Sequence, residues 1–276
     1  MKRWLSNLLI VIFAATFLIS AFLLIRYFWE SRQVQSRYDD LAALVEQNMA
    51  PEPADAVPEG SQAPTDATEP SPLVEITDPV TGKTVSVLRQ YAELYRMNSD
   101  LAGWLKIDGT KVNYPVMQTP ESPDYYLKRS FDKGYSEHGC LYAREVCDLN
   151  APSDNITIYG HHMRDGSMFG GLSRYKDQSY YESHSTLTFD TLTQSNTYEI
   201  LSVFLTTASE GEGFHYHLFS DASDEAHYNE FVDTCKALSL YDTGVDAVYG
   251  DKLITLSTCD YTQTNGRLVL VAKRIS

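Results

Sequence analysis

The sequence predicts a mostly β domain, a barrel or a sandwich, over residues 73–276. Short apolar or aromatic runs broken by turn signals recur along this part of the chain, at residues 111–116, 139–143, 156–159, 187–189 and 198–206. Two further runs near the C-terminus, 252–258 and 268–272, are rich in β-branched and aliphatic residues, and an Asn-Gly turn signal lies between them. About 200 residues are one domain's worth of chain.

The N-terminal segment predicts a single membrane-spanning helix. Residues 5–25 carry no charge and are long enough to cross a hydrocarbon core of about 30 Å. Lys2 and Arg3 precede them, which places the N-terminus in the cytoplasm by the positive-inside rule. A cleaved signal peptide is the competing interpretation, but the apolar run continues beyond the small residue Ala21. We therefore expect an uncleaved signal anchor over residues 1–30, a single pass, and an extracellular remainder.

Residues 31–72 are expected to form a helical stalk followed by a disordered tether. Leu41, Leu44 and Val45 recur at helical spacing. Residues 50–72 hold six prolines, five acidic residues and no Lys or Arg, a composition that cannot bury a core. The whole chain has a formal net charge of −15, and the part outside this tether remains strongly acidic. Nucleic acid is therefore not expected as a partner.

Two helices are predicted within the β domain. The first covers residues 93–105, because three apolar side chains would share one face: Leu94, Met97 and Leu101. The second covers about 223–238, with Ser223 as the N-cap. Its apolar stripe is interpreted as core packing and consists of Tyr228, Phe231, Val232 and Cys235.

The C-terminal hairpin brings a candidate nucleophile near an arginine. Side chains alternate along a strand, so Cys259 shares a face with Ser257, and Arg267 shares a face with Val269. If the hairpin forms, Cys259 and Arg267 flank the loop 260–266. A reactive thiol needs a nearby positive charge, and acyl transfer needs donors for a developing oxyanion. The alternative, more frequent for a lone cysteine, is an inert buried thiol and a surface arginine.

A second candidate lies where an apolar strand meets two histidines. Residues 156–163 read I-T-I-Y-G-H-H-M, and Gly160 permits a bend or a close backbone approach. His161 at the strand end would serve as general base and acid for Cys259. A pair of surface histidines is the alternative. The other closely spaced pair, His215 and His217, is interpreted as the polar side of a strand.

The remaining cysteines leave the redox state open. Cys140 and Cys147 are seven residues apart, and their spacing does not decide whether they form a disulfide in an exported protein. No C-x-x-C motif occurs, so no metal site is expected, and no cofactor is expected either.

Three motifs together resemble the class B sortases, cysteine transpeptidases of Gram-positive bacteria. T-L-S-T-C at 255–259 is similar to the sortase cysteine motif, and N-G-R-L-V-L-V-A-K at 265–273 resembles the arginine strand. Y-G-H-H-M-R-D-G-S-M-F at 159–169 is similar to the class B histidine motif, Y-G-H-N-M-x-D-G-x-M-F, with His162 where the family usually has Asn. Residues 101–116 resemble the class B entry helix and first strand. The resemblance spans about residues 90–274.

The resemblance implies an eight-stranded sortase-type β-barrel with an N-terminal helix and an extra helix between strands six and seven. It implies that Cys259 attacks the Thr carbonyl of a C-terminal sorting signal, an LPxTG-like or NPxTx-like pentapeptide of a surface protein. His161 would protonate the leaving amine, and Arg267 would bind the scissile carbonyl. An amine of a peptidoglycan cross-bridge or of lipid II would then resolve the thioacyl enzyme.

The resemblance and the strand positions also suggest a substrate groove, lined by Ser257, Asn113 and Met117. Two alternatives stay open. A pilin-polymerising sortase would often carry an Asp-Pro-aromatic lid and a second span, whereas here Asp78 and Pro79 precede Val80 and no second long apolar run occurs. A catalytically silent barrel that binds wall peptides is the other. The sequence leaves the pentapeptide and the acceptor amine undetermined.

Overall fold

The computed structural model describes residues 2–49, 72–77, 82–209 and 211–276. It divides into two compact units, Met1–Asp40 and Leu41–Ser276. The predicted tether, but for its last residue, and the Asp78–Pro79 dipeptide lie outside the described residues.

Helix α1 (Lys2–Met49) covers the apolar N-terminus and the residues up to 49 that follow it. From Trp4 onward it is long and apolar enough to cross a membrane. Its last turns, from Leu41 on, belong to the second unit. There Ala42 and Val45 line a cavity of about 350 Å³ together with Tyr91 and Trp104.

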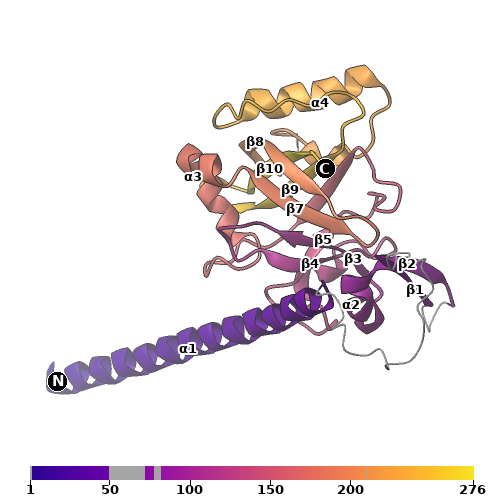
Figure 1. The fold of residues 1–276 in the computed structure, drawn as a ribbon. Coiled ribbons are helices and arrows are strands. Elements are labelled where there is room, and N and C mark those ends of the chain that lie inside the picture. The colour runs from indigo at the N-terminus through magenta and orange to yellow at the C-terminus, as the bar shows by residue number, and fades with distance from the viewer. Residues whose placement is uncertain (1, 50–71, 78–81, 210) are drawn as a thin grey trace, which may run out of the picture. The chain divides into compact units, whose positions relative to one another are not determined.

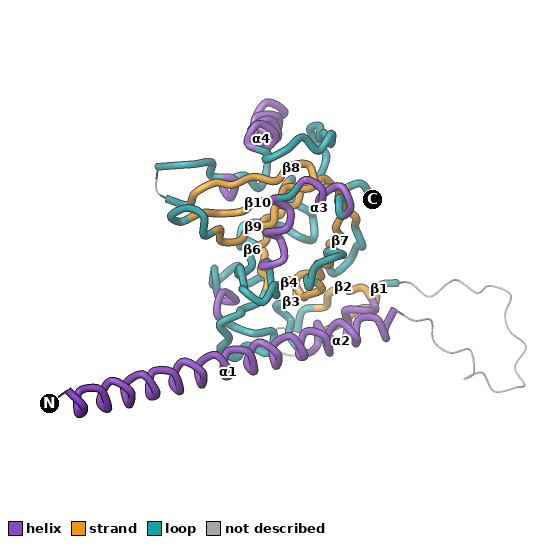
Figure 2. Tube along the Cα trace, turned by 90° about the vertical axis from the view of Figure 1, so that its left-hand side faces the viewer, coloured by secondary structure: helices purple, strands orange, loops and turns teal. Residues whose placement is uncertain are grey.

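The second unit is built on a closed barrel of eight strands, which confirms the predicted β-barrel (Figure 1). The strands are β3 (Leu101–Lys106), β4 (Asn113–Met117), β5 (Leu141–Ala143), β6 (Asn155–Tyr159), β7 (Thr186–Thr191), β8 (Thr197–Thr207), β9 (Leu253–Asp260) and β10 (Gly266–Arg274). Their order around the barrel is β10-β8-β7-β3-β4-β5-β6-β9. The pairs β4–β5 and β6–β9 are parallel and the other pairs antiparallel. Strand β9 therefore lies between β6 and β10, as Figure 2 also shows.

Short elements connect these strands. A separate hairpin, β1 (Leu73–Thr77) with β2 (Thr84–Leu88), precedes the barrel. The helices are η2 (Arg89–Tyr91), α2 (Ala92–Met97), η3 (Tyr125–Lys128), η4 (Gly170–Lys176), α3 (Gln178–Ser183), η5 (Tyr216–Leu218) and α4 (Glu225–Leu238), where η marks a 3-10 helix. Helix α4 lies between β8 and β9, the sixth and seventh barrel strands, as the resemblance implied.

The helix predicted over 93–105 was wrong beyond Met97. Asn98 is extended and ends α2, because its side chain donates to the Tyr126 hydroxyl and to the Phe131 carbonyl, 2.7 Å each. The following residues form β3, which pairs with β4 on one side and β7 on the other. Hydrogen bonding along both edges of β3 outweighs the helical spacing of the apolar residues.

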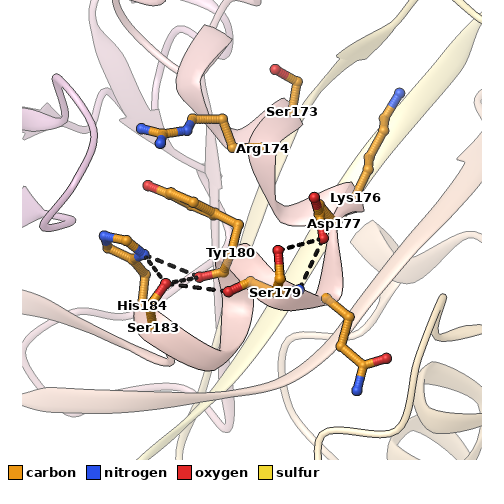
Figure 3. Close-up of a pocket in the computed structure, with 9 residues that line it drawn as sticks. Ser173, Arg174, Lys176, Asp177, Ser179, Tyr180, Ser183 and His184 are labelled. Atoms are coloured by element: carbon orange, nitrogen blue, oxygen red, sulfur yellow. Dashed lines mark hydrogen bonds between the residues drawn. The ribbon is translucent and has the colours of Figure 1, made fainter.

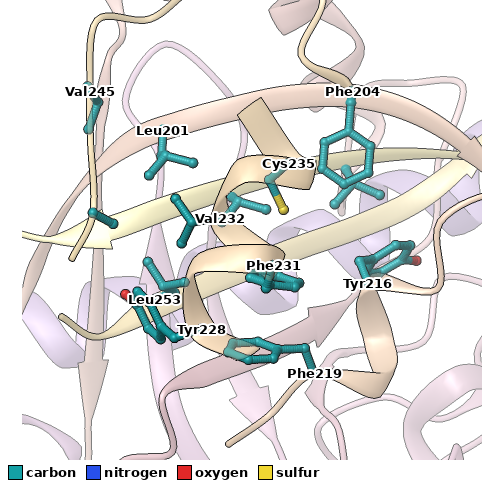
Figure 4. Close-up of a cluster of buried hydrophobic side chains, with 13 residues drawn as sticks. Leu201, Phe204, Tyr216, Phe219, Tyr228, Phe231, Val232, Cys235, Val245 and Leu253 are labelled. Atoms are coloured by element: carbon teal, nitrogen blue, oxygen red, sulfur yellow. The ribbon is translucent and has the colours of Figure 1, made fainter. Parts of the chain in front are cut away.

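Helix α4 covers the outer face of β8, β9 and β10 (Figure 4). Its predicted apolar stripe is buried, and Phe231 stacks on Phe219 with ring centroids 4.1 Å apart. The cap differs from the prediction by one residue: the Asp224 carboxylate, rather than Ser223, accepts the backbone N–H of His227 at 2.9 Å. Cys235 lies on the buried face of α4.

Contact with α4 identifies the outer face of the hairpin. Val269 and Val271 pack in the α4 cluster, and the register places Ser257 opposite Val269. Because side chains alternate, Cys259 and Arg267 continue this outer face beyond the covered part. The hairpin thus presents both residues on the outside of the barrel, at the end where β9 turns into β10.

Asp260, the last residue of β9, anchors this end of the hairpin. Its side chain is only 2% exposed, and it pairs with Lys176 at the end of η4. Figure 3 shows Lys176 extending away from Tyr180 and His184, although all three line the same surface cavity along η4 and α3. Thr262 donates to Asp260 from its hydroxyl and from its backbone N–H, the latter at 3.0 Å.

The ion pair makes a testable contribution to stability. Burial disfavours the charged form of Asp260, but Lys176 and Thr262 outweigh it, so the pKa of this carboxyl is lowered. A lowered folded-state pKa means that the carboxylate stabilises the fold above about pH 4, its unfolded pKa, and that this stabilisation is lost as the pH falls further. We expect Lys176→Met to lower the free energy of unfolding by about 2–3 kcal/mol at pH 7.

Urea unfolding of both proteins from pH 7 to pH 3 measures this effect, and the difference should shrink below about pH 4. Lys106→Met is the matched control, because Lys106 and Asp108 form an exposed pair at 3.6 Å. That control should change stability by less than about 1 kcal/mol. A Lys176 effect no larger than the control's would contradict the anchoring role.

Candidate active site

Cys259 and Arg267 are direct partners across the β9–β10 ladder, which confirms the geometry expected from the hairpin. Both side chains are partly exposed. Cys140, Cys147 and Cys235 are buried, and none of the four cysteines, all of which lie in described residues, forms a disulfide. Burial raises the pKa of the Cys147 and Cys235 thiols. Cys259 is therefore the cysteine that a substrate can reach.

Arg267 turns its guanidinium toward its own turn. Its Nη1 donates to the carbonyl of Asn265 at 3.2 Å and to that of Gly266 at 3.0 Å. Asn265 is left-handed, with φ 51°, and a Cβ on Gly266 would lie 2.4 Å from the Asp260 carbonyl oxygen. The Asn-Gly sequence is thus needed for the tight turn that sets the Cys259–Arg267 register.

His161 and His162 follow the end of β6. The last main-chain bond of this edge runs from the Gly160 N–H to the Ser257 carbonyl, at 3.2 Å. A Cβ on Gly160 would lie 2.5 Å from a methyl of Leu141, so the side chains packed here leave room only for glycine. His161 Nε2 lies 2.7 Å from the carbonyl oxygen of Leu127. His162 Nδ1 lies 2.8 Å from the carbonyl oxygen of Cys259 itself.

Ser257 is buried beneath a tyrosine. It is 2% exposed, and its hydroxyl is 2.5 Å from that of Tyr216 in η5. The pKa of Tyr216 is raised, chiefly by burial. The strand predicted around His215 and His217 was wrong, because Tyr216 begins a 3-10 helix whose tyrosine points inward. Ser257 is therefore covered in this structure, with Tyr216 in contact with its hydroxyl.

Two more tyrosines continue the row in which Ser257 lies. Tyr159 pairs with Ser257, and Tyr142 pairs with Tyr159, their ring centroids 5.4 Å apart. The Tyr142 hydroxyl donates to Asp124 at 2.8 Å. Burial raises the pKa of Tyr142, which Arg267 opposes electrostatically. The next member of the row, Met117, pairs with Tyr142 but is fully buried.

Asn113 is not brought to this site. It lies at the start of β4, paired with Lys106, and its Oδ1 accepts the indole N–H of Trp104 at 2.7 Å. It lines the cavity that contains Ala42 and Val45 at the end of α1. Of the three predicted groove residues, only Ser257 lies near Cys259, two residues earlier in β9.

Positive charge gathers on one side of Arg267. The Arg144 guanidinium bonds to the His217 carbonyl, and the rings of His215 and His217 are 5.8 Å apart. Burial lowers the pKa of His217, and Arg144, His215 and Arg267 lower it further. This side of the site therefore favours a neutral imidazole at His217 and a negative or electron-rich group from a ligand.

Sequence reasoning missed several residues of the site. Tyr159 and His162 stand inside the histidine motif, so their position was a usable signal. Tyr142, Tyr216 and Leu127 come from segments without any chemical motif, and only the barrel brings them to Cys259. No sequence pattern in those segments indicated this.

Comparison with known proteins identifies the family of this chain. The family model of the sortase domain matches residues 105–275. Sortase B of Staphylococcus aureus is 32% identical over 188 residues, covering 67% of this chain and 75% of that protein. Sortase B of Listeria monocytogenes is 30% identical over 203 residues, covering 72% and 78%.

Solved structures agree in fold. The Staphylococcus aureus sortase B–substrate complex matches with a TM-score of 0.71 and 27% identity, over 90% of this chain and 99% of that one. Sortase B of Bacillus anthracis in complex with AAEK1 matches with a TM-score of 0.69 and 27% identity over the same shares. The chain belongs to the sortase family and is a class B member, a cysteine transpeptidase of the cell wall.

Proposed function

We propose that this chain is a membrane-anchored transpeptidase that cleaves the C-terminal sorting signal of surface proteins and joins them to a peptidoglycan amine. The observation that carries the proposal is the direct pairing of Cys259 with Arg267, beside the histidines that follow β6. In this proposal Cys259, His161 and Arg267 are the catalytic residues.

Cys259 is the nucleophile. Its thiolate attacks the Thr carbonyl carbon of the sorting signal, and a carbon–sulfur bond forms while the carbonyl oxygen becomes an oxyanion. Partial exposure supports this role, since the other three thiols are buried. A thioester is a good acyl donor to amines, so transfer can compete with hydrolysis.

Arg267 binds the oxyanion. Its hydrogen bonds to the Asn265 and Gly266 carbonyls hold the planar guanidinium near Cys259. When substrate binds, its carbonyl oxygen replaces these two carbonyls as the acceptor. Guanidinium N–H groups are fixed in direction and always charged, which suits a charge that develops only in the transition state.

His161 moves the proton. Because a carbonyl oxygen only accepts, the contact with Leu127 requires a proton on Nε2, and the neutral ring keeps its lone pair on Nδ1. Nδ1 takes the thiol proton and gives it to the leaving amine when the carbon–nitrogen bond breaks. In the second half, the same nitrogen takes a proton from the acceptor amine as that amine displaces the thiolate.

The acyl donor we propose is an LPxTG-like or NPxTx-like pentapeptide, and the acceptor an amine of the peptidoglycan cross-bridge or of lipid II. Relatives have been solved as a sortase B–substrate complex and as a sortase B complexed with triglycine. The partly exposed rings of Tyr142 and Tyr159 would offer the peptide an aromatic surface beside Ser257.

Residues 1–30 are proposed as the membrane anchor, with the N-terminus cytoplasmic and the catalytic domain outside. The uncharged segment 5–25 supports this, together with Lys2 and Arg3 before it. External protease added to intact protoplasts should digest the catalytic domain while leaving a protected N-terminal tag. Protection of the catalytic domain instead would contradict this orientation.

The decisive experiment measures peptide cleavage and amine transfer by the full chain in detergent. A fluorogenic sorting peptide and triglycine are added, and mass spectrometry follows both the transfer product and an acyl adduct on Cys259. We expect Cys259→Ala to abolish both products and His161→Ala to reduce kcat by about 100-fold or more. Cys235→Ala, which removes a buried thiol under α4, is the matched control and should retain activity. Equal cleavage by wild type and Cys259→Ala would instead favour a silent peptide-binding barrel.

Arg267→Lys tests the oxyanion role, because an ammonium keeps the charge but loses the planar set of donors. We expect kcat/KM to fall about 100- to 1000-fold, the usual cost of one oxyanion donor. Arg274→Lys is the matched control at the far end of β10, where Nη1 contacts Asn196 at 3.5 Å. Unchanged kinetics in Arg267→Lys would remove this arginine from the mechanism.

A further inference from the structure

The carbonyl of Cys259 points to the edge of β9 that β6 pairs with, at a position beyond the end of β6. In a strand, the N–H and C=O of every second residue point to the same side. Ser257 accepts from Gly160, the residue after β6, so Cys259, two residues later, also presents its carbonyl toward the β6 side. Strand β6 ends at Tyr159, however, so its ladder with β9 does not continue as far as the Cys259 carbonyl.

The chain leaves the ladder because it folds back on itself. The Phe169 N–H donates to the His161 carbonyl at 2.9 Å, and His162 forms an isolated bridge with Met168. These bonds commit the backbone of the two histidines to the turn that follows. The Cys259 carbonyl would therefore lose its partner at the residue that carries the nucleophile.

The imidazole of His162 fills this gap. Its Nδ1 lies 2.8 Å from the Cys259 oxygen, and its ring packs against Tyr261 with centroids 5.4 Å apart. A carbonyl oxygen cannot donate, so Nδ1 carries the proton. Asn has its side-chain Nδ2 the same number of bonds from the backbone as Nδ1 of His. The departure from the histidine motif at this position thus keeps a donor in place.

We propose that His162 is a positioning residue that caps the Cys259 carbonyl in place of a main-chain N–H. The cap fixes the peptide of the nucleophile and, through the chain, holds the neighbouring His161 beside it. This inference rests on the proposed role of Cys259 as nucleophile. It assigns no proton transfer to His162, whose donor nitrogen is occupied by the cap.

The proposal predicts opposite tautomers for two adjacent histidines. His161 carries its proton on Nε2, facing Leu127, and His162 carries its proton on Nδ1, facing Cys259. Nitrogen-15 NMR of the full chain labelled at histidine, in detergent at pH 8, reads both tautomers. The signals are assigned with the single His161→Ala and His162→Asn variants. A neutral His162 protonated on Nε2 would overturn the cap.

Two substitutions of equal size separate the cap from other roles. His162→Asn keeps a donor at the same distance, and His162→Leu has the same branched shape without one. In the transfer assay we expect the Asn variant within about threefold of wild type, and the Leu variant to lose about tenfold in kcat at a similar KM, the worth of one hydrogen bond. Urea midpoints of the two variants check that both fold equally well.

Each outcome decides the proposal. Wild-type kinetics in His162→Leu would overturn it, because the cap would have no effect on the nucleophile. An Asn variant as impaired as His161→Ala would also overturn it, because the imidazole itself would then move protons. If the wild type cleaves no sorting peptide, both the proposed function and the positioning role are overturned. The NMR tautomers would still show whether His162 donates to the Cys259 carbonyl.

Discussion

The parallel pairing of β6 with β9 is the constraint on which the site depends. Cys259 and Arg267 meet within one hairpin, but His161 lies 98 positions earlier in the chain and reaches Cys259 only through this pairing. Gly160 makes the last contact possible, since any Cβ there would overlap Leu141 and Phe169. Parallel strands need a long crossover, and here it includes η4, α3, β7, β8 and α4.

This division explains what could be predicted from the sequence. The Cys259–Arg267 register follows from strand alternation and an Asn-Gly turn, which are local signals. The proposed partnership of His161 with Cys259 depends on a non-local pairing. The strand end before His161 made it a candidate, and the family resemblance added the reason to pair it with Cys259. The same limit applies to Tyr216, whose hydroxyl contacts Ser257 from 41 residues away. A pattern of residues in one segment contains no information about which distant segment covers it.

The errors have the same physical origin. Leu94, Met97 and Leu101 have helical spacing, yet pairing with both β4 and β7 makes residues 101–106 a strand. Asn113 and Met117 lie on a strand of the correct barrel, but one accepts from Trp104 and the other is buried, so strand membership alone did not give access to the site. Burial of α4, by contrast, was predictable because its apolar stripe is a property of one helix.

The two groups beside the proposed nucleophile, Cys259, are held by donors from other elements. The Cys259 carbonyl contacts His162, which follows β6, and the Asp260 carboxylate pairs with Lys176 of η4. Both groups would be costly to leave without a partner at the end of β9, where the ladder with β6 stops. Because the side chains of His162 and Lys176 act as these partners, the end of β9 is held in place next to a partly exposed thiol. A thiol on a fixed backbone needs no rearrangement before attack, which is the condition that oriented catalysis requires.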